Sequence, residues 1–199
     1  MSLTSFFQRL TGSAPPARPD VAGATHIILG SGKTGQPGWV STDRAVIDLC
    51  DRATFARHWQ PATRHAFMAE HVWEHLTPED GRTAIALCFE FLRPTGTLRI
   101  AVPDQLNPAA EYREYVRPGG TGPGADDHKI LYDYLTLEAA LCAAGFTVER
   151  QEYWDEAGQF QHRDWSDDRG YILRSRRYDP RNQDGKLGYT SLILDGIKP

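Results

Sequence analysis

Paired cysteines, long apolar runs and an excess of charge of one sign are all missing from this sequence. Its three cysteines, Cys50, Cys88 and Cys142, are far apart and odd in number, so neither a disulfide framework nor a cysteine metal site is expected. No apolar run is long enough to cross a membrane, and the first residues lack the pattern of a secretory signal. We therefore predict a cytoplasmic protein with reduced thiols and no membrane partner.

The charge balance also narrows the range of partners. A formal net charge of −4 provides no general attraction to phosphate backbones, so nucleic acid is not favoured. The densest basic stretch also contains Asp179, and we interpret it as a solvated face; it comprises Arg174, Arg176, Arg177 and Arg181. No feature of the sequence indicates an oligomeric state.

The length of 199 residues suits one domain. Residues 13–20 are rich in proline and small side chains, which is typical of a linker. We therefore assign 1–21 to an N-terminal segment and linker, and 22–199 to a single folded domain.

Short apolar runs alternate with segments of helical period, which predicts an α/β fold with a mostly parallel sheet and helices on both faces. The expected strands are 25–29, 39–42, 45–49, 65–69, 97–102, 146–151 and 191–195, and the expected helices are 77–92 and 136–144. Thr77 and Pro78 have the residue types of a helix start, and Gly145 that of a helix end. Residues 104–129 and 153–188 fit no regular element, and we expect the second to be an ordered element on the substrate side.

A glycine-rich turn follows the first expected strand. Gly30, Gly32 and Gly35 have the GxGxxG spacing, and such glycines allow a tight turn and a close approach of the backbone to a ligand. Asp43 ends the second expected strand, where an acidic residue holds ribose hydroxyls in nucleotide-binding α/β folds. The alternative for Asp43 is a position in a solvated turn, because the interval from Gly30 to Asp43 is shorter than the roughly 20 residues of a dinucleotide fold.

Two further motifs point to other chemistry and fit poorly. The run GSGKT suggests a P-loop with Lys33 on the phosphates, but a P-loop needs a glycine where this chain has Ile27. The run EHVWEH at 70–75 contains the HxxEH pattern of inverted zinc proteases, with His71 and His75 as ligands. It lies at the end of an expected strand and no third ligand follows on a second helix, so we interpret the histidines as capping or packing residues and predict no metal site.

With these motifs in view, the chain resembles the class I S-adenosylmethionine-dependent methyltransferases over about residues 25–199. The most specific parts are EHVWEHLTPEDG at 70–81 and FLRPTGTLRIAVPD at 91–104. The resemblance is closest to small predicted bacterial members of unassigned substrate. It implies a Rossmann-like class I methyltransferase fold with seven strands, in which the antiparallel last strand lies beside the fifth.

The resemblance also implies S-adenosylmethionine as the cofactor and assigns residues to it. The implied contacts are the methionine end at Gly30, Ser31 and Gly32, the ribose at Asp43, the adenine at Asp48 and Leu49, and the sulfonium at Glu70 and His71. One position departs from the family. Ile28 stands where many members have an acidic or amide residue, so its side chain cannot hold the amino group of the cofactor.

The expected reaction is transfer of a methyl group to an acceptor that the sequence does not identify. Alignment of the reactants can supply most of this catalysis, because the leaving thioether needs no proton. A hydroxyl or amine acceptor still needs a base, and four candidates fall at strand ends or in loops over the carboxyl edge of the sheet: His71, Asp104, His128 and Tyr132. Each also fits a packing or capping role. The alternatives are a non-catalytic methyltransferase-like binding module and a nucleotide-dependent oxidoreductase.

Overall fold

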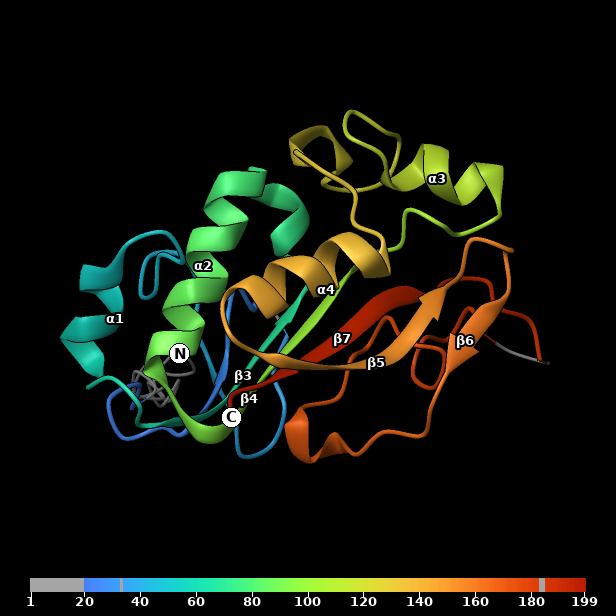
Figure 1. Cartoon of the computed structure of the whole chain (residues 1–199). Helices are drawn as coiled ribbons and strands as arrows, with labels where there is room; N and C mark the ends of the chain where they lie inside the picture. Colours follow the sequence, from blue (N-terminus) through green and yellow to red (C-terminus); the bar gives the residue numbers. More distant parts are fainter. Residues whose placement is uncertain (1–19, 33, 183–184) are drawn as a thin grey trace, which may run out of the picture.

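The computed structural model describes residues 20–32, 34–182 and 185–199 (Figure 1). Most of the expected N-terminal segment, residues 1–19, and Lys33 of the rejected P-loop lie outside this description. Val21 is buried, and its carbonyl accepts a hydrogen bond of 2.7 Å from Trp59 Nε1. Among the described helices, none has the length and apolar character needed to span a membrane.

The centre of the fold is a seven-stranded sheet with the order β2-β1-β3-β4-β7-β5-β6. Its strands are β1 (His26–Ile28), β2 (Val40–Ser41), β3 (Arg64–Glu70), β4 (Leu92–Pro103), β5 (Thr147–Trp154), β6 (Phe160–His162) and β7 (Ser191–Ile197). Strands β2, β1, β3 and β4 pair in parallel, whereas β7 is antiparallel to β4 and β5, and β6 is antiparallel to β5. The antiparallel last strand is confirmed. The mostly parallel sheet holds only for the half from β2 to β4.

One predicted strand is wrong, because residues 45–49 form turns. The side chain of Asp43 accepts the N–H of Ala45 at 3.0 Å, and its carbonyl accepts the N–H groups of Val46 and Ile47. These local bonds take the donors that a strand ladder would need. The seventh strand is instead β6, which forms a hairpin with β5 and was not predicted.

Three helices cover one face of the sheet: α1 (Arg52–His58), α2 (Pro78–Phe91) and α4 (Tyr134–Ala143). The side chains of Phe55, Ile85 and Leu137 from these helices share one buried core with Phe67 and Ile100 of the sheet. The prediction of α2 is confirmed within a residue at each end, and that of α4 within two. Two helices differ from the expectation of irregular structure: α1, and α3 (Ala110–Val116), a short helix over the carboxyl edge of the sheet.

The start of α2 follows the expected capping chemistry. The Thr77 side chain accepts the N–H of Asp80 at 3.2 Å, and Pro78 occupies the first turn, where its missing N–H costs nothing. Gly145 after α4 has a φ of +104°, a conformation that L side chains rarely adopt.

Within the described residues no α-helix covers the second face of the sheet, which corrects the prediction of helices on both faces. Alternate strand residues such as Ile28, Met68 and Ile193 pack there against Trp165 and Ile172. These two partners belong to residues 163–182, which we call the strap. The strap holds one short 3-10 turn, η3 (Asp167–Arg169), and otherwise runs extended or in turns.

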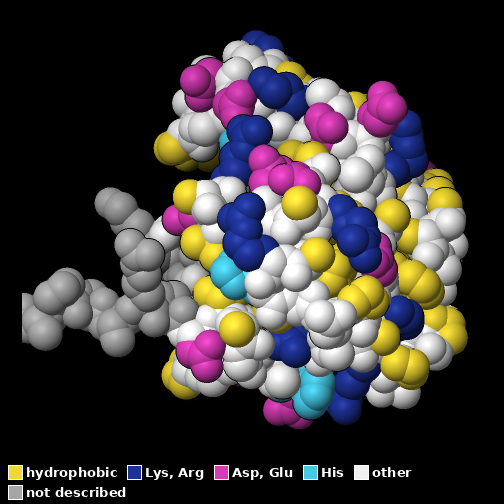
Figure 2. Space-filling model, turned by 90° about the vertical axis from the view of Figure 1, so that its left-hand side faces the viewer, with side chains coloured by type: hydrophobic (Ala, Val, Ile, Leu, Met, Phe, Trp, Pro, Cys, Tyr) yellow, Lys and Arg dark blue, Asp and Glu magenta, His cyan; other side chains and the backbone are white. Residues whose placement is uncertain are grey.

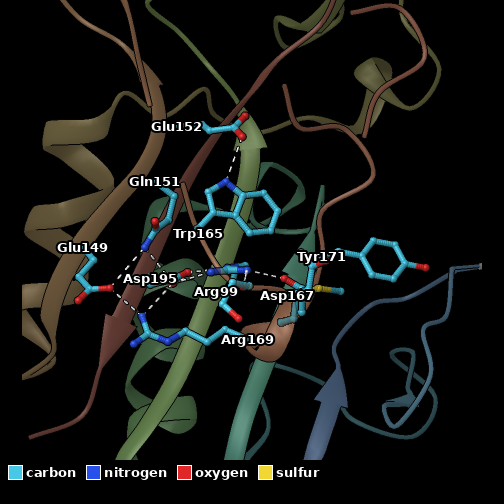
Figure 3. A network of polar contacts seen from close by, with 12 residues as sticks. Arg99, Glu149, Gln151, Glu152, Trp165, Asp167, Arg169, Tyr171 and Asp195 are labelled. Carbon is cyan, nitrogen blue, oxygen red and sulfur yellow. Dashed lines mark hydrogen bonds and ion pairs between the residues drawn. The ribbon is translucent and has the colours of Figure 1, made fainter. Parts of the chain in front are cut away.

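An arginine of the sheet, itself in a buried ion pair, binds the strap (Figure 3). Arg99 of β4 donates to both oxygens of Asp195 of β7 at 2.7 Å, and the two side chains are at most 1% exposed. Arg99 also donates to the carbonyls of Ser166 and Gly170, and its guanidinium lies 4.5 Å from the ring centroid of Trp165. Arg169 of the strap adds ion pairs with Asp195 at 3.2 Å and with Glu149 of β5 at 2.7 Å, so two arginines join this part of the strap to the sheet.

Two further carboxylates of the sheet bind backbone amides of the strap. Glu152 accepts the N–H of Arg176 at 2.7 Å and the indole N–H of Trp165 at 3.0 Å. Glu70 accepts the N–H groups of Leu173 at 3.0 Å and of Arg174 at 2.8 Å. Burial raises the pKa of Glu152, and the bonds from Arg176 and Trp165 to its carboxylate partly offset this rise. The strap is thus an ordered element, as expected for residues 153–188.

Candidate functional site

The glycine turn lies at the carboxyl end of β1, beside the end of β3. Gly30 has a φ of +62°, and a Cβ at this position would lie 2.7 Å from a methyl carbon of Val72. Only glycine satisfies both conditions. Ser31 donates its N–H to the carbonyl of Thr42 at 2.8 Å, which ties the turn to the end of β2.

No helix lies between β1 and β2 among the described residues 29–32 and 34–39. A dinucleotide fold places the pyrophosphate on the N-terminus of such a helix. A P-loop needs the same element. The described turn therefore lacks the helix N-terminus that binds phosphate in dinucleotide folds and P-loops. A ligand without phosphate does not need this helix N-terminus.

His71 follows the last residue of β3 and has a φ of +56°. Its Nε2 lies 3.0 Å from Ser191 Oγ, and its Nδ1 lies 3.2 Å from Glu74 Oε1. The Ser191 hydroxyl donates to the carbonyl of Arg174 at 2.8 Å, so it accepts from His71 Nε2. The ring is therefore bound to β7 through Nε2, and its Nδ1 edge faces Glu74 of the turn η1 (Trp73–His75).

Two cavities open at this edge of the sheet. The Asp48 cavity has a volume of about 570 Å³ and is lined by Asp48, Leu49 and Leu76, among others. The His128 cavity has a volume of about 550 Å³ and reaches under α3 to His128. Both cavities are lined by Gly30, His71 and His75, which form their shared wall.

Most of the expected cofactor residues line these cavities. Gly30, Ser31, Gly32, Glu70 and His71 line the His128 cavity, and Asp48 and Leu49 line the Asp48 cavity. The Asp48 carboxylate accepts the N–H of Cys50 at 2.9 Å and pairs with Arg44 at 3.1 Å. The bond from Cys50 is the main cause that lowers the pKa of Asp48. Asp43 is exposed and lines neither cavity.

The four candidate bases do not come together. His71 and His128 both line the His128 cavity. Asp104 is fully buried and accepts the N–H groups of Leu106 at 3.0 Å and of Trp154 at 2.8 Å. Burial raises its pKa to about 6. Tyr132 lines a separate cavity between α2 and α4, so neither Asp104 nor Tyr132 faces the shared wall.

The sequence analysis did not assign several residues of the His128 cavity to the site. Two come from the strap, Arg174 and Arg181, where we expected a solvated face. Arg181 pairs with Asp179 at 2.6 Å and lies 3.8 Å from the ring centroid of Tyr189, another lining residue. No local pattern marks these residues, because the strap reaches the cavity only through its distant bonds to the sheet.

The surface at the α1 end of the molecule is mixed in charge (Figure 2). Lysine and arginine side chains are interspersed there with aspartate and glutamate. This face therefore offers no continuous basic area of the kind that a nucleic acid backbone needs.

Comparison with solved structures identifies the fold. No protein-family model and no curated protein sequence matches the chain. A SAM-dependent methyltransferase from Archaeoglobus fulgidus is similar, with a TM-score of 0.54, 17% identity and coverage of 90% of this chain and 89% of that one. The fold is that of the S-adenosylmethionine-dependent methyltransferases.

Two other solved structures agree with this methyltransferase fold. An O-methyltransferase family protein from Burkholderia thailandensis has a TM-score of 0.51 and 13% identity, and the match covers 90% of this chain and 52% of that one. A SAM-dependent methyltransferase from Thermotoga maritima has a TM-score of 0.51 and 12% identity, with coverage of 87% and 73%. At such identities the likeness concerns the fold alone.

Proposed function

We propose that this chain is an S-adenosylmethionine-dependent methyltransferase. The observation that carries the proposal is the shared wall of Gly30, His71 and His75 between two cavities at the carboxyl edge of the sheet. Ligands of open α/β sheets bind at this edge. One cavity can hold the adenosine and the other the acceptor, so that the two reactants meet at the wall.

The cofactor, when bound, supplies a methyl group on a positively charged sulfur. Asp48 and Leu49 would receive the adenine, because they line the cavity on the α1 side. Gly30, Ser31 and Gly32 would lie against the methionine end. Asp43 itself lines neither cavity, but the next residue, Arg44, lines the Asp48 cavity. Asp43 would hold the ribose hydroxyls beside this cavity with its second oxygen, since Oδ1 accepts the N–H of Ala45.

Glu70 provides a carboxylate beside the glycine turn. Its side chain is 4% exposed and lines the same cavity as Gly30. The two strap amides leave part of its acceptor capacity unused, because a carboxylate offers about four lone-pair sites. Ile28 is buried among the apolar side chains on the second face of the sheet, and it takes no part in binding the cofactor. The resemblance implies that Glu70 borders the sulfonium; we assign to it instead the amino group of the cofactor, which Ile28 cannot bind.

The acceptor would bind in the His128 cavity. Its volume of about 550 Å³ suits a small molecule, and its lining is polar and aromatic, with His71, Arg174 and Tyr189. Orienting two reactants at the shared wall can lower the barrier by about 7–11 kcal/mol. His71 contributes by contact with both ligands, and its ring is already fixed by Ser191 and Glu74.

A non-catalytic binding module is the second candidate, and the burial of Ile28 favours it. Without an acidic side chain at that position, cofactor affinity rests more on Glu70 and on the backbone. The nucleotide-dependent oxidoreductase is disfavoured, because the described residues show no helix after the glycine turn to receive a pyrophosphate.

Calorimetric titration with S-adenosylhomocysteine tests the proposal. We expect binding of one molecule per chain to the wild type, and affinity at least about tenfold lower in Asp43→Ala, which loses hydrogen bonds between a charged group and the ribose. The matched control is Asp164→Ala, whose fully exposed side chain lines neither cavity. No binding, or equal binding of NAD, would refute the cofactor assignment. Binding without turnover over a broad acceptor screen would favour the binding module.

A further inference from the structure

A glutamate and two histidines meet in the His128 cavity. Glu74 and His75 belong to η1, directly after β3, and His128 follows the 3-10 turn η2 (Ala125–Asp127). One carboxylate oxygen of Glu74 and one ring nitrogen of each histidine lie within 4.8 Å of one another. All three side chains line the cavity.

Glu74 is a buried charge without a hydrogen-bond partner. Its side chain is 0% exposed, and neither carboxylate oxygen accepts a hydrogen bond within the described part of the chain. Oε1 lies 3.2 Å from His71 Nδ1, which is ion-pair distance without hydrogen-bond alignment. Burying a carboxylate is costly unless a charge or metal compensates it. The second oxygen has no such partner, and it requires one.

The histidines are oriented as metal ligands are. His128 Nδ1 lies 2.7 Å from the carbonyl oxygen of Val116, which can only accept, so Nδ1 carries a hydrogen and a metal would bind at Nε2. His75 Nδ1 lies 3.4 Å from a carboxylate oxygen of Asp127. Metal-binding histidines use such carbonyl and carboxylate partners to fix the ring and its tautomer.

We propose that Glu74, His75 and His128 bind a divalent transition metal of the zinc class. Two imidazoles and one carboxylate form a common set of three protein ligands for such ions, and they leave one position open. Ligand atoms around zinc lie about 3.3 Å apart, so the present separations of at most 4.8 Å close with small side-chain rotations. Glu74 would keep Oε1 toward His71 and give Oε2 to the metal.

The ligand set differs from the one in the HxxEH pattern. That pattern pairs His71 with His75, but His71 Nε2 is bound to Ser191 and His71 precedes η1. His128 comes from the loop after α3 instead, far away in the sequence, which is why the sequence analysis predicts no metal site. In the proposed methyltransferase the open position would face an acceptor that carries a hydroxyl or carboxylate. Only this last point rests on the proposed function.

Titration of the metal-free protein with Co²⁺ tests the site, because cobalt replaces zinc and its visible absorption reports low coordination. The protein is freed of any histidine tag and of metal by a chelator, and no S-adenosylmethionine is present. We expect one ion per chain with such absorption, and affinity at least about tenfold lower in His128→Ala and Glu74→Gln. The matched control is His162→Ala on β6, an exposed histidine outside the cavity, which should bind as the wild type does.

Three results would overturn the proposal: no absorption change in the folded wild type, saturation only with more than one ion of equal affinity, or equal binding by all variants. Circular dichroism shows whether the variants are folded. If they are not, X-ray absorption of the zinc-loaded wild type decides, because the site requires two imidazoles and oxygen ligands in the metal shell. Binding of S-adenosylhomocysteine is measured separately, so failure of either proposal leaves the other standing.

Discussion

Replacing Arg99 by methionine probes its buried ion pair with Asp195 and its bonds to the strap. The change removes both bonds to Asp195 and leaves that carboxylate 0% exposed, with only Gln151 at 3.0 Å and Arg169 at 3.2 Å as donors to its Oδ2. It also leaves the carbonyls of Ser166 and Gly170 without their donor. Breaking a buried pair by removing one partner costs about 3–5 kcal/mol. For a chain of this length that corresponds to a melting point lower by about 6–20 °C.

Urea unfolding, followed by tryptophan fluorescence, measures this loss of unfolding free energy. The double variant Arg99→Met/Asp195→Leu should lose less than the sum of the single variants by about 0.5–3 kcal/mol, because it leaves no unpaired charge. The control is Arg117→Met, which breaks the exposed pair with Glu114, whose side chains are 49% and 52% exposed. This control should lose less than about 1 kcal/mol.

The same variant should loosen the strap. In Arg99→Met, amide hydrogen exchange should become faster than in the wild type. This increase should be larger in residues 163–182 than in the helix-covered half of the molecule. A loss below about 1 kcal/mol would refute the reasoning, since it would mean that the buried pair contributes no more than a surface pair. Uniform exchange in both halves would refute the attachment role.

Three further predictions concern single positions. Gly30→Ala should lower stability by about 1–3 kcal/mol and weaken S-adenosylhomocysteine binding, because φ is +62° and the new Cβ meets Val72 at 2.7 Å; thermal melts and calorimetry measure both. Burial raises the pKa of Asp104 from 3.8 to about 6, so the folded state holds this proton more tightly than the unfolded state does. The free energy of unfolding of the wild type, relative to that of Asp104→Asn, should therefore be highest below about pH 4. It should fall by about 3 kcal/mol as the pH rises through about 6, and urea titrations at each pH measure it. Thr77→Ala should cost about 1 kcal/mol by removing the cap of α2.

Each of these predictions has its own check. Gly38→Ala has a φ of +79° but open space around the new Cβ, so it isolates the contact with Val72 from the backbone strain. An equal loss in both glycine variants would contradict the steric argument. A flat stability difference between pH 4 and 7 would contradict the burial of the Asp104 charge. Thr83→Ala, on the exposed surface of α2, should not lose stability, and an equal loss there would exclude capping as the cause at Thr77.

Local chemistry explains which elements could be predicted. An apolar run marks β3, and the residues Thr77 and Pro78 mark the start of α2. Each signal extends over only a few neighbouring residues, so both elements could be predicted. The segment 45–49 is apolar in the same way as β3. However, the Asp43 side chain accepts a hydrogen bond from the N–H of Ala45, and the chain forms a turn there. Helix α1 was missed because it is short and buries only Phe55.

The strap shows why the second face could not be predicted. It is attached by bonds between residues far apart in the sequence, such as the bond from Arg99 to the carbonyl of Gly170, two residues that are 71 positions apart. Neither the composition of the strap nor its period shows which sheet residues bind it. The alternation of strand and helix patterns predicts helices on both faces. In the structure the carboxylates of Glu70 and Glu152 bind the backbone of an extended segment instead.

The candidate site was predictable where a motif surrounds it. The glycine turn and the EHVWEH run place Gly30, Glu70 and His71 at one sheet edge, because strands that pair in parallel end at the same edge. Glu74 lies in the same run, but its burial without a hydrogen-bond partner appears only in three dimensions. His128 was predicted as a base, and its position beside Glu74 suggests the different role proposed above.

The most direct test of the central claim is a crystal structure of the chain grown with S-adenosylhomocysteine. We expect adenine density in the Asp48 cavity beside Leu49, and the sulfur at the shared wall between Gly30 and His71. Density for the ligand in any other cavity, or two empty cavities in crystals of saturated protein, would contradict it.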